Sequence, residues 1–392
     1  MVFSSVEFLA LFLPLFLSIY FLAPKAARNL VLCCGSWTFY LWWKPIFLPL
    51  IIGITFTAWH FGRMIESAQR PRKSLALILG IGVSVGCLVW FKYANLLVAT
   101  TDTALALFER GPLPWHTILL PIAISFTVLQ AVSYLIDVHR GVVKAQPSFI
   151  NFSAYLDMFP HLIAGPILRY SSINLALIRR ETNFADFAAG ARRFMLGFAS
   201  KVLIADSLAP LVDRAFSLPQ PSLADAWLGN LAFALQIYFD FVGYSAMAIG
   251  LGRMLGFPYP ENFRDPYLAT SISDFWRRWH ITLSTWLRDY LYIPLGGNRR
   301  GEVRTYVNLV TTMAIGGLWH GASWAFLVWG LIHGVALAVA RAWRLLGVAL
   351  PAAGRVASQS SFPVDLSKAW ILLSWSVAAI KTRPPEVTRG PP

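Results

Sequence analysis

Long apolar stretches without charged side chains constrain this chain more than any other feature of its sequence. The most extreme stretch runs from Thr305 to Ala340 and contains no Asp, Glu, Lys or Arg. Further apolar runs cover residues 8–24, 30–43, 46–59, 75–91, 117–136, 194–203, 226–239 and 370–380. In lipid the backbone must satisfy its own hydrogen bonds, and the runs are continuous instead of alternating, which favours helices over a β-barrel. The sequence therefore predicts an all-α polytopic membrane protein.

The composition agrees with a membrane protein and helps to set the expected number of segments. Hydrophobic residues make up 57% of the chain and charged residues 13%, whereas soluble domains have about 25% charged residues. The mean hydropathy is +0.58. Because a bilayer core of about 30 Å needs about 20 helical residues, several runs are too short to cross upright. We expect roughly nine to eleven membrane segments, together with interfacial and re-entrant helices.

Basic residues indicate how the chain is oriented in the membrane. Lys25 and Arg28 follow the first apolar run, and further basic residues lie at positions 63–73, after the third run. The positive-inside rule places both loops in the cytoplasm and the N-terminus outside. Arg304 and Arg341 also indicate cytoplasmic positions, so the apolar stretch between them is expected to cross the membrane and return. The net charge of +14 then reflects topology and anionic lipid, with no nucleic-acid partner expected.

The organisation along the chain is simple up to residue 345. No repeat, low-complexity linker or soluble-domain boundary interrupts residues 1–345, which we predict to form one membrane domain. The first residues lack the basic n-region of a signal peptide, so a retained first helix is expected. Residues 346–392 are predicted to hold a loop, a partial final helix and a disordered tail, because residues 351–369 and the ending TRPPEVTRGPP are rich in Pro, Ser, Arg and Gly.

A charged and aromatic segment, residues 253–304, precedes the longest apolar stretch. At 100° per residue, Trp276, Trp279, Leu283, Trp286, Leu287 and Tyr290 fall on one arc, and Arg277, Arg278, Thr285, Arg288 and Asp289 fall opposite. The pattern predicts one amphipathic helix that starts with Ser273 or Asp274 as N-cap and ends at Pro294. Its residues Arg277, Arg278 and Arg288 either anchor the helix to lipid phosphates or bind the phosphates of a donor substrate.

Two of the seven histidines lie in apolar surroundings. His320 interrupts the uncharged stretch among small residues, and His280 lies at the edge of the apolar arc. Burial keeps an imidazole neutral, and a neutral imidazole can accept a proton. Each histidine is therefore either a core residue bonded to a backbone carbonyl or part of an active site, with His320 as a general base. A metal site that adds His333 has weak support, because the spacing matches no ligand motif, and no metal is expected.

Asp240 is the only charged residue between Asp225 and Arg253 and lies within an apolar part of the chain. An acid inside a membrane segment is a candidate for substrate binding. The alternative is an ion pair with an arginine of residues 253–304 that holds helices together.

Three strings of this sequence resemble the membrane-bound O-acyltransferase family, and within it the bacterial alginate O-acetylase branch. They are QIYFDFVGYSAMAIGLGRMLGFPYPENF (236–263), PYLATSISDFWRRWHITLSTWLRDYLYIPLGGNR (266–299) and GGLWHGASWAFLVWGLIHG (316–334). The resemblance implies membrane helices around a central cavity. It also implies that His320, in the LWHG string, is the catalytic histidine and that His280, in the RWH string, is the second active-site histidine.

The resemblance also implies a reaction and a location. The donor would be cytoplasmic acetyl-coenzyme A, with no bound cofactor. The acceptor would be hydroxyl groups of an exported, alginate-like polysaccharide, reached directly or through a separate extracytoplasmic acetyltransferase, at the bacterial inner membrane. Two departures from the family pattern are Ala246, where members usually have an acid, and an end that falls short of the usual length. These departures leave an inactive truncated homologue as one alternative. A membrane transporter is the other, because intramembrane His and Asp with short broken helices also describe a substrate pathway.

Overall fold

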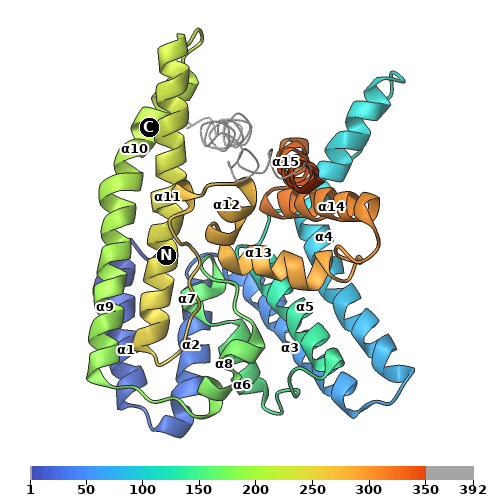
Figure 1. The fold of residues 1–392 in the computed structure, drawn as a ribbon. Coiled ribbons are helices and arrows are strands. Elements are labelled where there is room, and N and C mark those ends of the chain that lie inside the picture. Colours follow the sequence, from blue (N-terminus) through green and yellow to red (C-terminus); the bar gives the residue numbers. More distant parts are fainter. Residues whose placement is uncertain (1, 350–392) are drawn as a thin grey trace. The chain divides into compact units, whose positions relative to one another are not determined.

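The computed structural model describes residues 2–349, and within this range every regular element is a helix (Figure 1). The elements are η1 (Glu7–Phe12), α1 (Leu13–Leu22), η2 (Lys25–Ala27), α2 (Arg28–Leu41), η3 (Pro45–Phe47), α3 (Leu48–Ser67), α4 (Arg72–Ala106), α5 (Ile124–Arg140), α6 (Phe149–Leu156), α7 (Phe159–Leu162), α8 (Tyr170–Ile178), α9 (Phe184–Ala199), η4 (Ser200–Ala205), α10 (Asp206–Ser217), α11 (Leu223–Met254), η5 (Pro266–Leu268), α12 (Ile272–Arg278), α13 (Ile281–Leu287), η6 (Arg288–Tyr292), α14 (Glu302–His320) and α15 (Trp324–Ala349). The predicted all-α fold is confirmed for this part of the chain. The apolar run 370–380 and the predicted tail beyond residue 349 lie outside the described residues.

Five helical segments among the described residues are long and apolar enough to cross a membrane. They are Pro45–Ser67, Arg72–Ala106, Phe184–Ser217, Leu223–Met254 and Trp324–Leu345. The chain is thus a multi-pass membrane protein. The expectation of roughly nine to eleven segments counted every apolar run, and several of these runs form shorter helices. The run 117–136, for example, is irregular up to residue 123 and becomes helical only in α5.

The described residues form two compact units. The first contains residues 2–198 and 243–261, and the second contains residues 199–242 and 262–349, so α11 contributes to both. In the first unit α3, α4 and α5 pack against one another, and α2 packs against α6. Buried aromatic side chains fill the space around the N-terminal helices, and Phe159 lies within 5.0–6.4 Å of the rings of Phe3, Phe8, Phe12, Phe16 and Phe39.

One carboxyl group is fully buried in the first unit. Asp157 accepts hydrogen bonds from the hydroxyl groups of Thr55 (2.6 Å) and Ser153 (2.6 Å) and from the indole of Trp37 (3.1 Å). Loss of hydration raises the pKa of Asp157 to about 6, although its three donors oppose the shift. This carboxyl group thus ties α2, α3 and α6 together through polar contacts in an otherwise apolar core.

Glycines bring α9 against the second half of α11, also within the first unit. A Cβ atom at Gly190 would lie 2.6 Å from the carbonyl oxygen of Gly250, and one at Gly197 would lie 2.6 Å from that of Gly243. These contacts are with backbone atoms, which cannot rotate away as a side chain can. Small residues at both positions therefore let the two helices approach closely, as in many membrane helix pairs.

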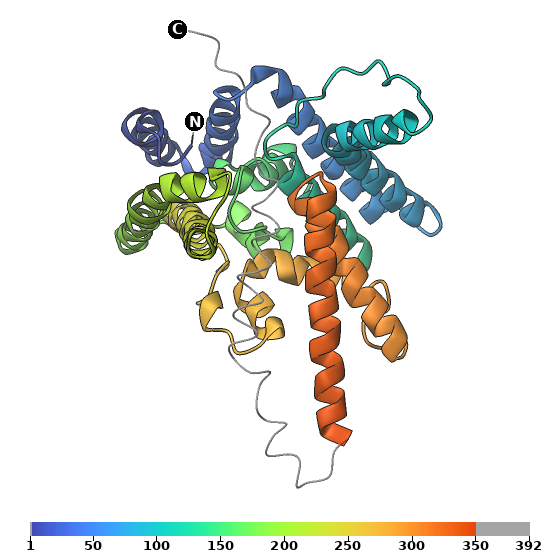
Figure 2. The same cartoon turned by 90° about the horizontal axis from the view of Figure 1, so that it is seen from above.

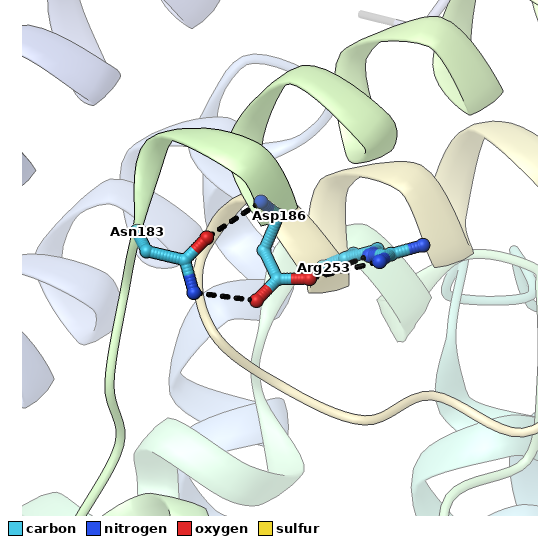
Figure 3. A network of polar contacts seen from close by, with 3 residues as sticks. All are labelled: Asn183, Asp186 and Arg253. Atoms are coloured by element: carbon cyan, nitrogen blue, oxygen red, sulfur yellow. Dashed lines mark hydrogen bonds and ion pairs between the residues drawn. The ribbon is translucent and has the colours of Figure 1, made fainter.

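A polar network joins the start of α9 to the last turn of α11, as Figure 3 shows. The Asn183 side chain accepts a hydrogen bond from the backbone N–H of Asp186 (2.7 Å) and donates one to its carboxylate (2.8 Å). Arg253, in the last turn of α11, donates two hydrogen bonds to the same carboxylate at 2.8 and 3.1 Å. The helix start and the arginine are thereby joined through one acid.

In the second unit, α14 and α15 form a hairpin that turns at residues 321–323 and lie side by side (Figures 1 and 2). A Cβ atom at Gly317 would overlap the carbonyl oxygen of Phe326, and one at Gly330 would overlap that of Met313. At the open end Arg341 forms an ion pair with Glu302 (2.8 Å). The uncharged stretch thus folds back on itself as a helical hairpin, and its crossing of the membrane stays a prediction.

Candidate active site

His280 lies in a break between α12 and α13, in the second unit. Its backbone has φ +42° and ψ +54°, and its side chain is fully buried. The prediction of one continuous amphipathic helix is therefore wrong. The predicted N-cap is wrong too, because Ser271 caps α12 by accepting a hydrogen bond from Asp274 N (3.1 Å). The apolar arc itself is buried, as expected: its six aromatic and leucine residues are at most 9% exposed.

Asn262 explains why the chain breaks here. Its backbone carbonyl accepts a hydrogen bond from Ile281 N (2.9 Å). Its side-chain oxygen accepts two more, from Thr282 N (3.3 Å) and the Thr282 hydroxyl (2.9 Å). These bonds satisfy the first two backbone N–H groups of α13 from a separate segment and replace helical bonds across the break. Helical periodicity cannot reveal such a break, because both halves keep their apolar side on the same arc.

The same amide determines the protonation of His280. The Nδ1 atom lies 3.2 Å from the Asn262 side-chain oxygen. That atom must be the oxygen, because it also faces the N–H of Thr282, which can only donate. Nδ1 therefore carries the hydrogen, and the lone pair is on Nε2, which is buried and has no hydrogen-bond partner among the described residues. Burial, and then the nearby His320, hold the pKa of His280 well below its ordinary value, so the ring is neutral.

His320 is the last residue of α14 and lies close to His280. The two ring centroids are 6.4 Å apart, and the indole of Trp319 lies 6.1 Å from His280. On the other side, Trp329 of α15 lies 5.2 Å from His320. The structure thus brings together the two histidines that the sequence singled out and places aromatic rings beside both; His280 is fully buried, and His320 is half-buried. Their chemical roles stay a prediction.

His333 extends the same cluster along α15. Its ring lies 4.6 Å from Trp329 and 5.2 Å from Trp276, and it is fully buried. Both of its ring nitrogens are without a hydrogen-bond partner in the part of the chain that the structure describes. Over residues 2–349 no group of three His, Cys, Asp or Glu side chains is arranged to hold a metal ion.

The predicted substrate-binding arginines differ in their surroundings. Arg278 pairs with Asp274 (2.9 Å), four residues earlier on α12, and Arg288 pairs with its neighbour Asp289 (2.6 Å). Arg277 is exposed. Two of the three guanidinium groups are therefore already engaged by carboxylates, which leaves less of their charge for a phosphate group.

Asp240 forms an ion pair, but with a different partner from the one expected. Its carboxylate lies 2.6 Å from Nζ of Lys201, which also contacts Asp206 at 3.1 Å. The predicted pairing with an arginine of residues 253–304 is wrong. The lysine lies in η4, and nothing in the local sequence pattern links that position to α11. The carboxylate is about half exposed, so the pair joins helices without being buried.

Sequence reasoning missed Asn262 and Thr282 as parts of the site. Both lie within the strings that carry the family resemblance, at the ENF and RWHIT segments. Neither has a charge, a metal-ligand spacing or a place in the apolar arc. Only the fold shows that they hold His280.

Comparison with known proteins shows the family to which the chain belongs. Residues 140–351 match the model of the membrane-bound O-acyltransferase family. Over 347 residues the chain is 51% identical to a protein of Azotobacter vinelandii named "probable alginate O-acetylase". The aligned region covers 88% of this chain and 70% of that protein. A protein of the same name from Pseudomonas putida is 49% identical over 87% of this chain and 71% of its own length. The peptidoglycan O-acetyltransferase of Helicobacter pylori is 37% identical over 88% and 71%. The chain belongs to the membrane-bound O-acyltransferase family.

Proposed function

We propose that this protein transfers an acetyl group from acetyl-coenzyme A toward hydroxyl groups of an exported polysaccharide at the bacterial inner membrane. The names of similar proteins support the class of acceptor. The protein that is 51% identical is named for alginate, and the protein that is 37% identical is named for peptidoglycan. Both names describe O-acetylation of a glycan polymer. Alginate or a closely similar polymer is the acceptor that we propose.

His320 acts as the general base in this proposal. It takes the proton of the acceptor hydroxyl as the oxygen attacks the thioester carbonyl, the carbon–sulfur bond breaks, and the departing thiolate recovers the proton. General-base catalysis of this kind typically raises the reaction rate by about 10²- to 10⁴-fold. The observation that carries the proposal is the pair of imidazoles with ring centroids 6.4 Å apart, beside the indole rings of Trp319 and Trp329.

His280 is proposed to accept a proton or a hydrogen bond through Nε2. Its roles in orienting the thioester carbonyl or stabilising an oxyanion would need a donor on that atom. The hydrogen bond from Nδ1 to Asn262 instead supports a lone pair on Nε2. Of the roles considered from the sequence, sharing the proton with His320 therefore has the best support.

The proposed topology follows from charge and length. With the N-terminus outside and Arg304 and Arg341 in the cytoplasm, α14 starts on the cytoplasmic side. Its 19 residues rise ~27 Å, close to the thickness of a bilayer core. His320, at its far end, would then be able to pass acetyl to the outside, either to the polymer or to a separate extracytoplasmic acetyltransferase.

Replacing His320 with alanine tests the function. The purified variant in detergent should lose release of the coenzyme A thiol and transfer of radiolabelled acetyl to deacetylated polymer, with unchanged expression. His116→Ala, in an exposed loop, is the matched control and should keep both activities. Full activity in the His320 variant would refute the assignment. Wild-type protein that never cleaves the thioester but moves a solute across vesicles would favour a transporter.

A further inference from the structure

A glycine-containing loop between η6 and α14 forms a cavity with an excess of positive charge. The cavity has a volume of about 320 Å³ and is lined by residues 292–300, which contain the sequence GGNRR. Small-molecule sites are typically about 300–1,000 Å³, so the cavity can hold a part of a substrate. Neither the sequence patterns nor the histidine cluster assigns a role to this loop.

Two glycines shape the loop and fix it to α14. Gly296 has φ +117°, and a Cβ atom there would lie 2.9 Å from Cδ of Arg300, so the missing side chain makes room for the arginine to cross the loop. The next residue, Gly297, has φ +54°, which also favours glycine. Its carbonyl oxygen accepts a hydrogen bond from the buried side chain of Asn308 (2.9 Å). This hydrogen bond therefore fixes the loop to α14.

The backbone of the loop is largely engaged in its own turns. Gly296 N donates to Ile293 O (3.0 Å), Gly297 N donates to Tyr292 O (2.9 Å), and Arg299 N donates to Gly296 O (3.1 Å). These N–H groups are unavailable to a bound anion. The capacity to bind an anion therefore resides in the side chains of Arg299 and Arg300.

The charge of these two arginines is not neutralised by the neighbouring acids. Asp289, on one side in the sequence, pairs with Arg288, and Glu302, on the other side, pairs with Arg341. Between residues 2 and 349, neither Arg299 nor Arg300 forms an ion pair, and both are exposed. The contrast with Arg278 and Arg288, which are paired, identifies the loop as the stronger anion site.

We propose that Arg299 and Arg300 bind the phosphate groups of the acyl-coenzyme A donor, an inference that rests on the proposed function. Guanidinium groups match phosphate oxygens in pairs and carry a permanent charge. Asn308, which anchors the loop, lies twelve residues before His320 on α14, a rise of ~18 Å. Coenzyme A has its phosphates at one end and its thioester at the far end of a long pantetheine arm. Two separate sites along one helix suit a ligand of that shape.

The test compares two thioester donors on one double variant. Arg299→Gln with Arg300→Gln should lower kcat/KM for acetyl-coenzyme A relative to that for S-acetylpantetheine, which lacks the phosphates, by about 10- to 100-fold, since hydrogen bonds to charged groups contribute roughly that factor. Arg110→Gln, an exposed arginine in another loop, should leave the ratio unchanged. An unchanged ratio in the double variant would overturn the proposal. A thermal melt of each variant confirms that it is folded.

A direct binding measurement separates this proposal from the proposed function. Adenosine 3′,5′-bisphosphate should bind the wild-type protein in calorimetry and bind the double variant at least tenfold more weakly. Wild-type protein that binds this probe but cleaves neither thioester would refute acetyl transfer and keep the phosphate site. If the loop instead binds lipid phosphate, the probe would not bind, and the double variant would lose its response to added phosphatidylglycerol. That result would overturn the donor assignment.

Discussion

Replacing Asn262 with leucine would remove the amide oxygen that holds His280 while keeping the branching of the side chain. Three hydrogen bonds to that oxygen disappear, from His280 Nδ1 and from the N–H and hydroxyl of Thr282. Each is worth about 0.5–1.5 kcal/mol net, so the free energy of unfolding should fall by roughly 2–4 kcal/mol. The imidazole is then free to exchange its tautomers.

The same change should affect catalysis separately from stability. Loss of the orientation and tautomer of His280 is worth about 1–3 kcal/mol, which corresponds to a fall in kcat of about 5- to 150-fold. The assay is thioester cleavage by purified protein in detergent, measured below the melting temperature of every variant. The KM for acetyl-coenzyme A should change little, because the phosphates are bound elsewhere in the proposed arrangement.

Asn262→Asp is the matched control, since a carboxylate still accepts all three hydrogen bonds. In the wild-type protein burial keeps the pKa of His280 well below its ordinary value, so the ring is neutral at neutral pH. A carboxylate beside Nδ1 favours the imidazolium and raises that pKa. Activity that needs a neutral ring should then be lost as the pH falls, at a higher pH than in the wild type. Wild-type kcat in the leucine variant together with an unmoved pH profile in the aspartate variant would refute the reasoning.

Three further predictions concern stability and topology. Gly250→Ala should destabilise the protein by about 1–3 kcal/mol, because its Cβ would lie 2.6 Å from Gly190 O. The control Gly53→Ala has open space around the new Cβ and should not destabilise it. Equal melting temperatures of the two variants would contradict the close helix contact. The pKa of Asp157 rises from its ordinary 3.8 to about 6 on folding. The folded state therefore binds the extra proton, and its stability should fall by roughly 3 kcal/mol as the pH rises from about 3 to about 7. Asp157→Asn should flatten that dependence in thermal melts, and an unchanged slope would show that another group causes it. Ser323→Cys, in a background without the native cysteines, should react with an impermeant thiol reagent added from outside intact cells, whereas labelling from the cytoplasmic side alone would reverse the proposed topology.

The arginine assignments show how far sequence reasoning reaches for charged residues. The helical wheel places Arg278 and Arg288 on the polar side correctly, yet it does not reveal that Asp274 and Asp289 engage them. The pairing of Asp240 with Lys201 joins positions 39 residues apart in the sequence. Charge pairing depends on which helices become neighbours, and that information is absent from any local window.

The sequence by itself determined the helical membrane fold and the hairpin around His320. Continuous uncharged apolar runs in lipid favour helices, which satisfy their own backbone, and the basic residues at both ends of residues 305–340 predict that the chain returns. Motif resemblance pointed to His280 and His320. Only the tertiary structure decided that the chain breaks at His280, because the bonds that replace the helical ones come from Asn262. It also decided which nitrogen of His280 holds the lone pair, since a tautomer is set by the partner of the other nitrogen, and that partner arrives from a separate segment of the fold.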